Sequence, residues 1–190
     1  MSVPTTLESE RLVMRIPVES DAPELLRYRI DNRAHLAPWE PLREHIYYTL
    51  DHCLQTIADA RETARLDRGY PFAVFDAASC EWVATLNLAN IVRGAFQACH
   101  LGYGIAAARQ GQGMMREALT AGLAFAFGPL GLHRVMANYM PHNQRSAQLL
   151  TRLGFEREGY AKRYLNIAGQ WEDHVLTALI REDQKNSAST

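Results

Sequence analysis

The chain has 190 residues, 47% of them hydrophobic, and a net charge of -1 from 20 basic and 21 acidic side chains. This length and apolar content suit one buried core, which predicts a single domain over residues 1–181 and a polar, frayed tail over residues 182–190. Because the acids and bases balance, no overall field draws the protein to nucleic acid or to an anionic membrane, and we expect no sequence-specific nucleic acid binding.

The cysteines and the apolar segments indicate the cellular compartment. Cys53, Cys80 and Cys99 form no CxxC pair, which predicts reduced, buried thiols and no metal site. The first residues lack a signal-peptide core, and no segment reaches the roughly 18 to 20 apolar residues of a membrane helix. We therefore expect a cytoplasmic protein with no membrane partner and no metal ion.

The first third of the chain predicts one strand and two helices. The strand covers residues 11–16, and a helix follows from a cap at Ser20 and Asp21 to Asn32. From residue 45 to 69, apolar residues recur at intervals of three and four, which predicts the second helix.

The rest of the chain alternates short apolar runs with glycine and proline. Three successive strands joined by short turns predict an antiparallel meander, and two helices are interleaved with the remaining strands. The order predicts an α/β domain with a mixed, mostly antiparallel central sheet flanked by helices. The expected strands cover 70–75, 82–91, 97–105, 134–139, 155–165 and 170–180, and the expected helices begin at Gly113 and Asn143.

A glycine-rich loop precedes the helix that begins at Gly113. Gly111 and Gly113 remove side chains where the free backbone N–H groups of a helix start can bind a phosphate, so the segment predicts a pyrophosphate cradle. The alternative is a tight strand-to-helix turn. A dinucleotide fingerprint at residues 102–107 is rejected, because no acidic residue lies between Glu117 and Glu156.

The segment from Leu101 to Ala118 resembles the acyl-CoA signature of the GNAT superfamily. Further blocks resemble the ribosomal-protein-alanine N-acetyltransferases, the RimJ type, and together they span nearly the whole chain. This resemblance implies a GNAT fold, acetyl-CoA as co-substrate, and transfer to the N-terminal alanine of a small-subunit ribosomal protein. The blocks are residues 36–41, 90–99, 137–146, 152–156, 158–162 and 169–179.

The resemblance also implies the residues that bind the cofactor. One departure is Ala108, which stands where many relatives carry Arg or Gln. Asn143 could instead only cap its helix. The implied cofactor-binding residues are Tyr103, Gly104, Ile105, Gln110, Gly111, Gln112, Gly113, Met114, Asn143 and Ser146.

Acetyl transfer needs a neutral amine and a proton for the leaving thiolate. Leu150 stands where many relatives place an acidic Tyr, so Ser146 is the expected catalytic acid, with an ordinary helix residue as the alternative. His100 stands where relatives often have Glu and is the expected catalytic base, although a lone strand histidine is commonly structural. An α-amine has a pKa of about 7.7–8.0 against about 10.4 for lysine, so it needs a weaker base to become neutral. The lack of a strong candidate base therefore favours an α-amine as acceptor.

Trp39, Glu40 and Asp173 are the expected substrate-binding residues, with a packed loop and a solvated sheet edge as the alternatives. The expected partner is the N-terminal segment of a ribosomal protein, with the ribosomal subunit as a further candidate. The oligomeric state stays open. Rival functions are acetylation of a small amine, such as an antibiotic or polyamine, and a ribosome-assembly or regulatory protein that retains acetyl-CoA with little turnover.

Overall fold

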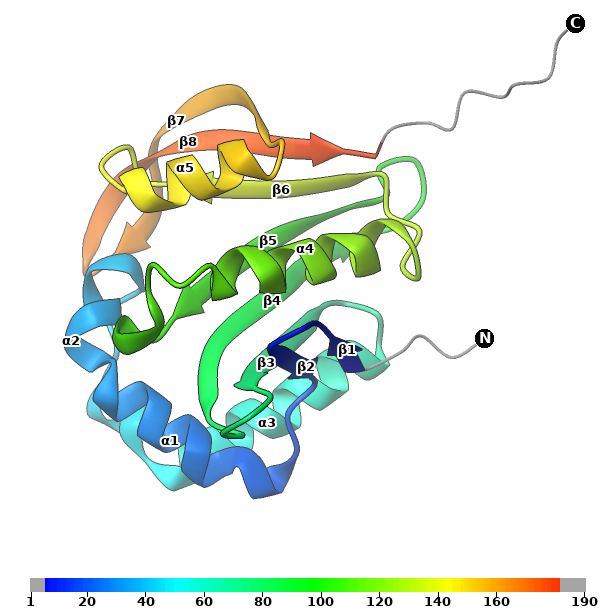
Figure 1. The fold of residues 1–190 in the computed structure, drawn as a ribbon. Coiled ribbons are helices and arrows are strands. Elements are labelled where there is room, and N and C mark those ends of the chain that lie inside the picture. The colour runs from blue at the N-terminus through cyan, green and yellow to red at the C-terminus, as the bar shows by residue number, and fades with distance from the viewer. Residues whose placement is uncertain (1–5, 182–190) are drawn as a thin grey trace, which may run out of the picture.

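The computed structural model describes residues 6–181, which build one eight-stranded sheet in the order β1-β2-β3-β4-β5-β6-β8-β7 (Figure 1). Neighbouring strands pair antiparallel except β5 with β6, which pair parallel. The expected mixed, mostly antiparallel sheet is thereby confirmed. The strands are β1 (Thr6–Glu8), β2 (Leu12–Arg15), β3 (Tyr70–Asp76), β4 (Trp82–Val92), β5 (Ala98–Ile105), β6 (Arg134–Tyr139), β7 (Glu156–Ile167) and β8 (Gln170–Ile180).

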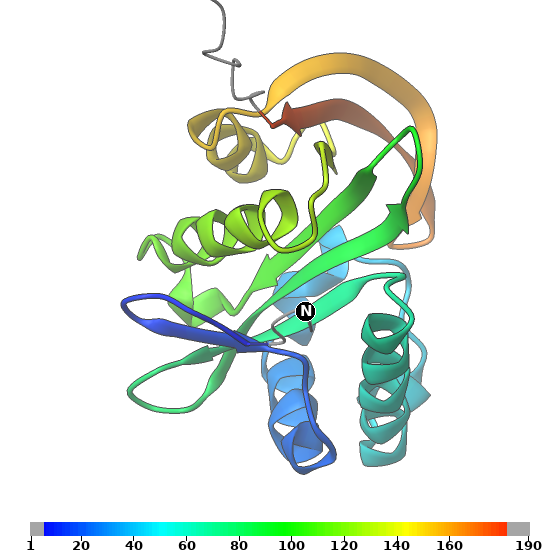
Figure 2. The ribbon, with the colours of Figure 1, turned by 90° about the vertical axis from the view of Figure 1, so that its right-hand side faces the viewer.

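Helices cover both faces of this sheet, with α4 and α5 on one side and α1 and α3 on the other (Figure 2). Short 3-10 turns link α2 to α3 and lead into α4. The helices are α1 (Ala22–Asp31), α2 (Arg33–Leu36), α3 (Leu50–Arg65), α4 (Met114–Phe127) and α5 (Gln144–Arg152), and the turns are η1 (Glu19–Asp21), η2 (Ala37–Trp39), η3 (His45–Tyr48) and η4 (Ala107–Arg109).

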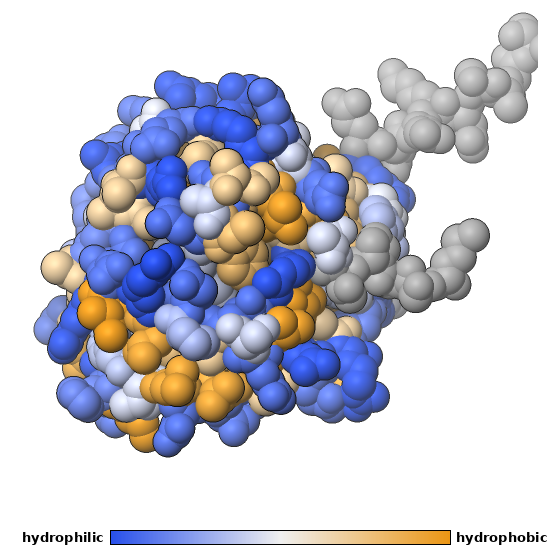
Figure 3. Space-filling model, turned by 60° about the horizontal axis from the view of Figure 1, so that its bottom comes forward, coloured by the Kyte–Doolittle hydropathy of each residue, from blue (hydrophilic) through white to orange (hydrophobic). Residues whose placement is uncertain are grey.

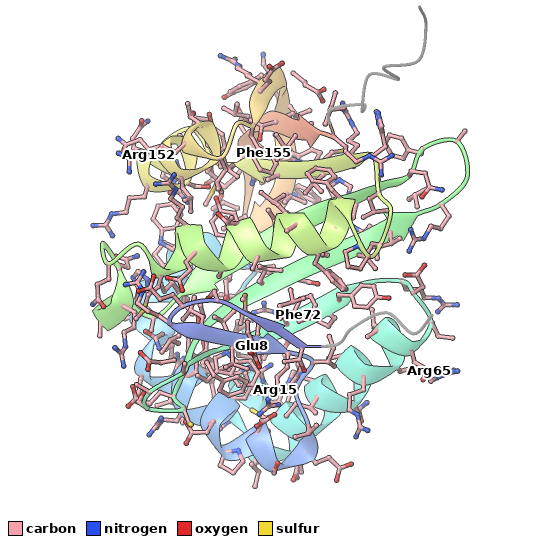
Figure 4. All side chains as sticks on the ribbon, turned by 45° about the vertical axis from the view of Figure 1, so that its right-hand side comes forward. Glu8, Arg15, Arg65, Phe72, Arg152 and Phe155 are labelled. Carbon is pink, nitrogen blue, oxygen red and sulfur yellow. The ribbon has the colours of Figure 1, made fainter. Side chains whose placement is uncertain are left out.

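The larger core lies between the sheet and α4. Strand residues alternate between the two faces, so the apolar ones on this face meet the apolar stripe of α4. Phe72 of β3, labelled in Figure 4, packs edge to face on Phe125 of α4, with ring centroids 5.3 Å apart. A Cβ at Gly122 would lie 2.6 Å from Leu86 Cδ1, so glycine lets α4 approach β4 closely.

Several details differ from the sequence-based expectations, which also contained no helix at Arg33–Leu36. β1 has three residues and was not expected. The second helix starts at Leu50, because Thr49 has extended backbone and its side chain accepts from the His52 N–H.

Two predicted side-chain environments also differ. Asp21 does not cap α1 through its side chain, because its carboxylate binds Arg15. Cys80 is exposed rather than buried, since it lies between β3 and β4 with φ 58°. The expected tail, residues 182–190, lies outside the described residues.

The outer face of α1 and α3 carries exposed apolar side chains, seen in orange among hydrophilic residues in Figure 3. Ile30 and Leu50 border an open pocket of about 400 Å³ on this face. Within residues 6–181, no helix is long and apolar enough to cross a membrane.

Candidate active site

The parallel ladder between β5 and β6 is short. It contains three residue pairs and ends at His100 opposite Met136, and the strands diverge beyond this point (Figure 1). Within the part of the chain that the structure describes, Leu101–Ile105 of β5 has no ladder partner on the β6 side, although it pairs with β4 on the other. Backbone N–H and C=O groups on the open edge need partners, so an extended ligand can bind there.

The expected glycine loop lies at the end of β5 and leads into α4. Gly111 and Gly113 have φ values of 73° and 78°, which non-glycine residues adopt only with strain. A Cβ at Gly111 would meet nothing within 4 Å, so the backbone here is open to an approaching group. The loop and the unpaired first N–H groups of α4 suit a pyrophosphate.

The tip of the β1–β2 hairpin braces this loop from outside. The Arg11 guanidinium donates to the Gln112 carbonyl at 3.0 Å and pairs with Glu117 of α4 at 2.7 Å. Ser9 Oγ also donates to Glu117, at 2.8 Å. Arg109, by contrast, is held away from the loop by Asp76 and Glu81, at 3.5 and 2.7 Å.

Tyr103 and Ser146 meet across the open side of β5. Their hydroxyl oxygens lie 2.7 Å apart, and both side chains are half-buried. Burial raises the pKa of Tyr103 to about 12 although the hydrogen bond with Ser146 opposes the shift, so Tyr103 stays protonated at neutral pH. Sequence reasoning missed this pair because Tyr103 was expected only as a cofactor contact. Leu150 is buried in the core, 1% exposed.

The start of α5 and the end of β5 are linked around the expected cofactor residues. Asn143 caps α5 by accepting from the Ser146 N–H at 3.1 Å. Gln110 contacts His35 Nε2 at 3.1 Å and accepts from Arg145 of α5. The same His35 nitrogen lies 3.2 Å from the Ile105 carbonyl. The sequence carried no signal for His35 or Arg145.

His100 occupies the last ladder pair before the strands diverge. Its side chain faces the α1 side of the sheet with Gly104, opposite to Tyr103, because residues alternate along β5. The ring is half-buried, its Nδ1 has no hydrogen-bond partner among the described residues, and burial lowers its pKa. His100 is thus held in the neutral form that can accept a proton.

Trp39 and Glu40 lie where two loops meet near α5. The Trp39 ring contacts the ring of His142, just before α5, with centroids 5.6 Å apart. The Glu40 carbonyl accepts from the Ala168 N–H in the β7–β8 turn at 2.8 Å. The expected substrate-binding loop therefore connects the start of α5 to the β7–β8 turn.

Asp173 lies in β8 and has partners within the β7–β8 ribbon. Its carboxylate accepts from the Tyr160 hydroxyl at 2.7 Å and from the Arg163 N–H at 2.8 Å, beside an irregularity in β7. Hydrogen bonds from Arg163 and then Tyr160 lower the pKa of Asp173. These contacts give Asp173 a structural role, and its contact with substrate stays a prediction.

A cofactor with a pyrophosphate and an extended arm fits these residues. The open glycine loop suits the phosphates, and the unpaired edge of β5 suits the arm. Within residues 6–181, no three His, Cys, Asp or Glu side chains group as a metal site would.

Comparison with known proteins identifies relatives along nearly the whole chain. Residues 11–156 match the family described as acetyltransferase (GNAT) domain. The chain is 47% identical over 182 residues to the [ribosomal protein uS5]-alanine N-acetyltransferase of Escherichia coli (strain K12), covering 93% of this chain and 91% of that enzyme.

Solved structures agree with this similarity. The ribosomal-protein-S5-alanine acetyltransferase from Vibrio fischeri superposes with a TM-score of 0.90 at 39% identity, covering 96% of this chain and 100% of that one. Mycobacterium smegmatis RimJ in complex with CoA-disulfide superposes with a TM-score of 0.89 at 32% identity, covering 97% and 91%.

Proposed function

Because the chain belongs to the GNAT acetyltransferase family, we propose that it transfers the acetyl group of acetyl-CoA to the N-terminal alanine of ribosomal protein uS5. The observation that carries this proposal is the 47% identity to an enzyme of that specificity over 93% of the chain. The short β5–β6 ladder and the glycine loop support it, because they supply an open strand edge beside a phosphate cradle.

Acetyl-CoA would supply an activated acetyl thioester. The backbone N–H groups of the Gln110–Gly113 loop and of the start of α4 from Met114 would hold its pyrophosphate. The open edge of β5 at Tyr103, Gly104 and Ile105 would hold the arm and offer an N–H to the thioester carbonyl, where negative charge develops. The cap at Asn143 fixes the start of α5 beside this edge.

Two proton movements remain, one at each face of β5. His100, neutral because burial lowers its pKa, would accept the proton of the incoming α-ammonium directly or through water. The Ser146 hydroxyl would give a proton to the departing thiolate and be resupplied by Tyr103, which is 2.7 Å away. The bond from nitrogen to the acetyl carbon forms as the carbon–sulfur bond breaks, so one proton leaves the amine and one reaches the thiolate.

The acceptor amine would enter between Trp39 and the β7–β8 turn. The Glu40 carboxylate, which accepts from Arg43 at 3.3 Å, would also accept from the α-ammonium, and the Trp39 ring would form an apolar wall for the alanine methyl group. An α-amine with a pKa near 8 is partly neutral at pH 7, so a single modest base suffices.

Synthetic peptides test this function directly. Peptides with N-terminal Ala, N-terminal Ser or a blocked N-terminus, each with an internal lysine, are incubated with acetyl-CoA, and mass spectrometry locates the acetyl group. We expect modification of the α-amine of the Ala peptide and none of the blocked peptide. Labelling of lysine, or tight acetyl-CoA binding without turnover, would contradict the proposal and favour one of the rival functions.

A further inference from the structure

Arg29 of α1 carries a buried positive charge. Its side chain is 5% exposed, yet none of the ion pairs formed within residues 6–181 includes it. In the described part of the chain its guanidinium donates to neutral acceptors only, and it lies over the face of the Tyr47 ring, 3.8 Å from the centroid. Those acceptors are Tyr47 O at 2.9 Å, Thr56 Oγ1 at 3.0 Å, His52 Nδ1 at 3.2 Å and Cys53 Sγ at 3.4 Å.

Among residues 6–181, these neutral partners leave the Arg29 charge without a counter-ion. A guanidinium can only donate, so the Nδ1 of His52 is the acceptor in this contact and adds no negative charge. The Nε–H of Arg29 finds no acceptor among the described residues. Burying an unpaired charge is costly, whereas the other partly buried arginine of this region, Arg15, has both carboxylate oxygens of Asp21 at 2.6 and 2.7 Å.

Arg29 lines a pocket of about 90 Å³ that also receives two other arginines. Arg33 lies over the Tyr48 ring and Arg43 over the Tyr47 ring, 4.6 and 4.4 Å from the centroids, so aromatic faces hold these guanidiniums at the wall. The single acid in the lining is Glu40, which accepts from Arg43 at 3.3 Å. The full lining is Arg29, Arg33, Leu36, Ala37, Glu40, Pro41, Leu42, Arg43, Tyr47, Tyr48 and Ala168.

This arginine pocket adjoins the proposed entry of the acceptor. Glu40 and Ala168, which line it, make the main-chain bond between the substrate-binding loop and the β7–β8 turn. Trp39 precedes Glu40 and faces His142 at the start of α5. A peptide whose first residue lies beside Trp39 therefore has its following residues within reach of the pocket, since each extended residue adds about 3.3 Å.

We propose that the arginine pocket binds the carboxylate of an acidic side chain in the acceptor, a few residues after its N-terminal alanine. The proposal rests on the proposed function and names a specificity determinant for it. Three guanidinium groups face one carboxylate here, and the planar fork of arginine matches a second carboxylate. A small concave pocket with aromatic walls suits a single side-chain carboxylate better than a nucleic acid backbone, which follows an extended basic surface.

A peptide scan tests this proposal. Peptides begin with Ala and contain otherwise neutral residues, with one Glu at each position from 2 to 6 in turn, and each has a twin with Gln. For the wild type, one Glu position should lower KM about tenfold relative to its twin with kcat unchanged within about twofold, the size of one charge-assisted hydrogen bond. The preference should weaken as salt is raised.

Two exposed arginines and one distant arginine supply the variants. Arg33→Gln and Arg43→Gln should each reduce the Glu-over-Gln preference to about threefold or less. Arg65→Gln removes the same charge at the far end of α3, where Figure 4 shows the side chain pointing away from the body, and should keep the full preference.

Each other outcome overturns the proposal in a distinguishable way. Equal KM for every Glu peptide and its twin, with both acetylated, would remove the carboxylate site and leave the proposed function intact. Competition by a short RNA oligonucleotide that Arg33→Gln abolishes, without any Glu preference, would assign the pocket to phosphates instead. Acetylation of no Ala peptide would remove both the acceptor and the pocket's role.

Discussion

Removing the hydroxyl groups of Tyr103 and Ser146, singly and together, tests the proposed proton path. In the structure the two oxygens lie 2.7 Å apart and act on one leaving group, so Tyr103→Phe and Ser146→Ala should each disable the same path. The departing thiolate has a pKa of about 8.5, so pH 7 lies roughly 1.5 units below the pH at which it is stable without a proton. A proton donor for this group is therefore worth up to about 30-fold in kcat.

We therefore expect each single variant to lower kcat about 10- to 30-fold at pH 7, and the double variant to be no more than about threefold slower than either single one. At pH 9 the loss should shrink to about threefold or less, because the thiolate then no longer needs a proton. Titration of Tyr103 cannot produce this change, since burial raises its pKa to about 12.

The assay is steady-state release of CoA from acetyl-CoA with an Ala peptide, at pH 7 and pH 9. Unfolding in denaturant accompanies it, because loss of one hydrogen bond costs about 0.5–1.5 kcal/mol of stability. Tyr70→Phe is the matched control, as it removes a hydroxyl bonded to Asp67 at 3.2 Å, away from the proposed site. Single variants within twofold of the wild type, or losses that multiply in the double variant, would refute the proton path.

Three further predictions concern the loop, an ion pair and the base. Gly111→Ala should raise KM for acetyl-CoA about tenfold. Its control is Gly94→Ala, because Gly94 has the same φ of 73° and the same open space; it should cost the same backbone strain of about 1–2 kcal/mol and leave KM unchanged. Equal KM values for the two variants would contradict the phosphate cradle. Asp21→Asn should lower the free energy of unfolding by about 1.5–3 kcal/mol at pH 7. Burial raises the pKa of Asp21, but hydrogen bonds from Arg15 and Val18 outweigh it and lower the pKa below that of the unfolded chain. The contribution is therefore complete above about pH 3.9 and is lost as the pH falls through the folded value; a difference between the two proteins that stays constant as denaturation curves are taken to lower pH would contradict it. His100→Gln should reduce kcat/KM about tenfold at pH 7. Because burial lowers the pKa of His100, the wild type should keep its advantage over the variant below about pH 6.5. Identical pH profiles for the wild type and the variant would exclude His100 as the base.

The sequence predicted the regular elements well and the short or interrupted ones poorly. β6 (Arg134–Tyr139) and β8 (Gln170–Ile180) have the expected bounds, because apolar runs between glycine and polar turns mark strands locally. β1 has only three residues and no pattern of its own, so pairing with β2 makes it a strand. Thr49 interrupts an apolar periodicity that continues through it, so periodicity alone began the second helix too early.

The residues of the candidate site also differ in how far the sequence could predict them. Gly111 and Gly113 could be predicted because a positive φ and an absent side chain belong to the residue itself. The hydrogen bond between Tyr103 and Ser146 joins a strand to a helix 43 residues away, and no local pattern carries such a contact. Arg29 lies on a predicted helix, but its burial and its neutral partners depend on η3 and α3, which fold against it.

Only three residue pairs join β5 to β6, so the strands β1 to β5 and the strands β6 to β8 are connected within the sheet by a short ladder. An extended ligand that binds along the open edge of β5 would add contacts beside that ladder, so the same binding event would serve catalysis and stabilise the fold. Saturating acetyl-CoA at about 100 times its Kd would add about 2.7 kcal/mol to the free energy of unfolding. The resistance of this protein to unfolding and proteolysis would then rise and fall with the acetyl-CoA supply around it.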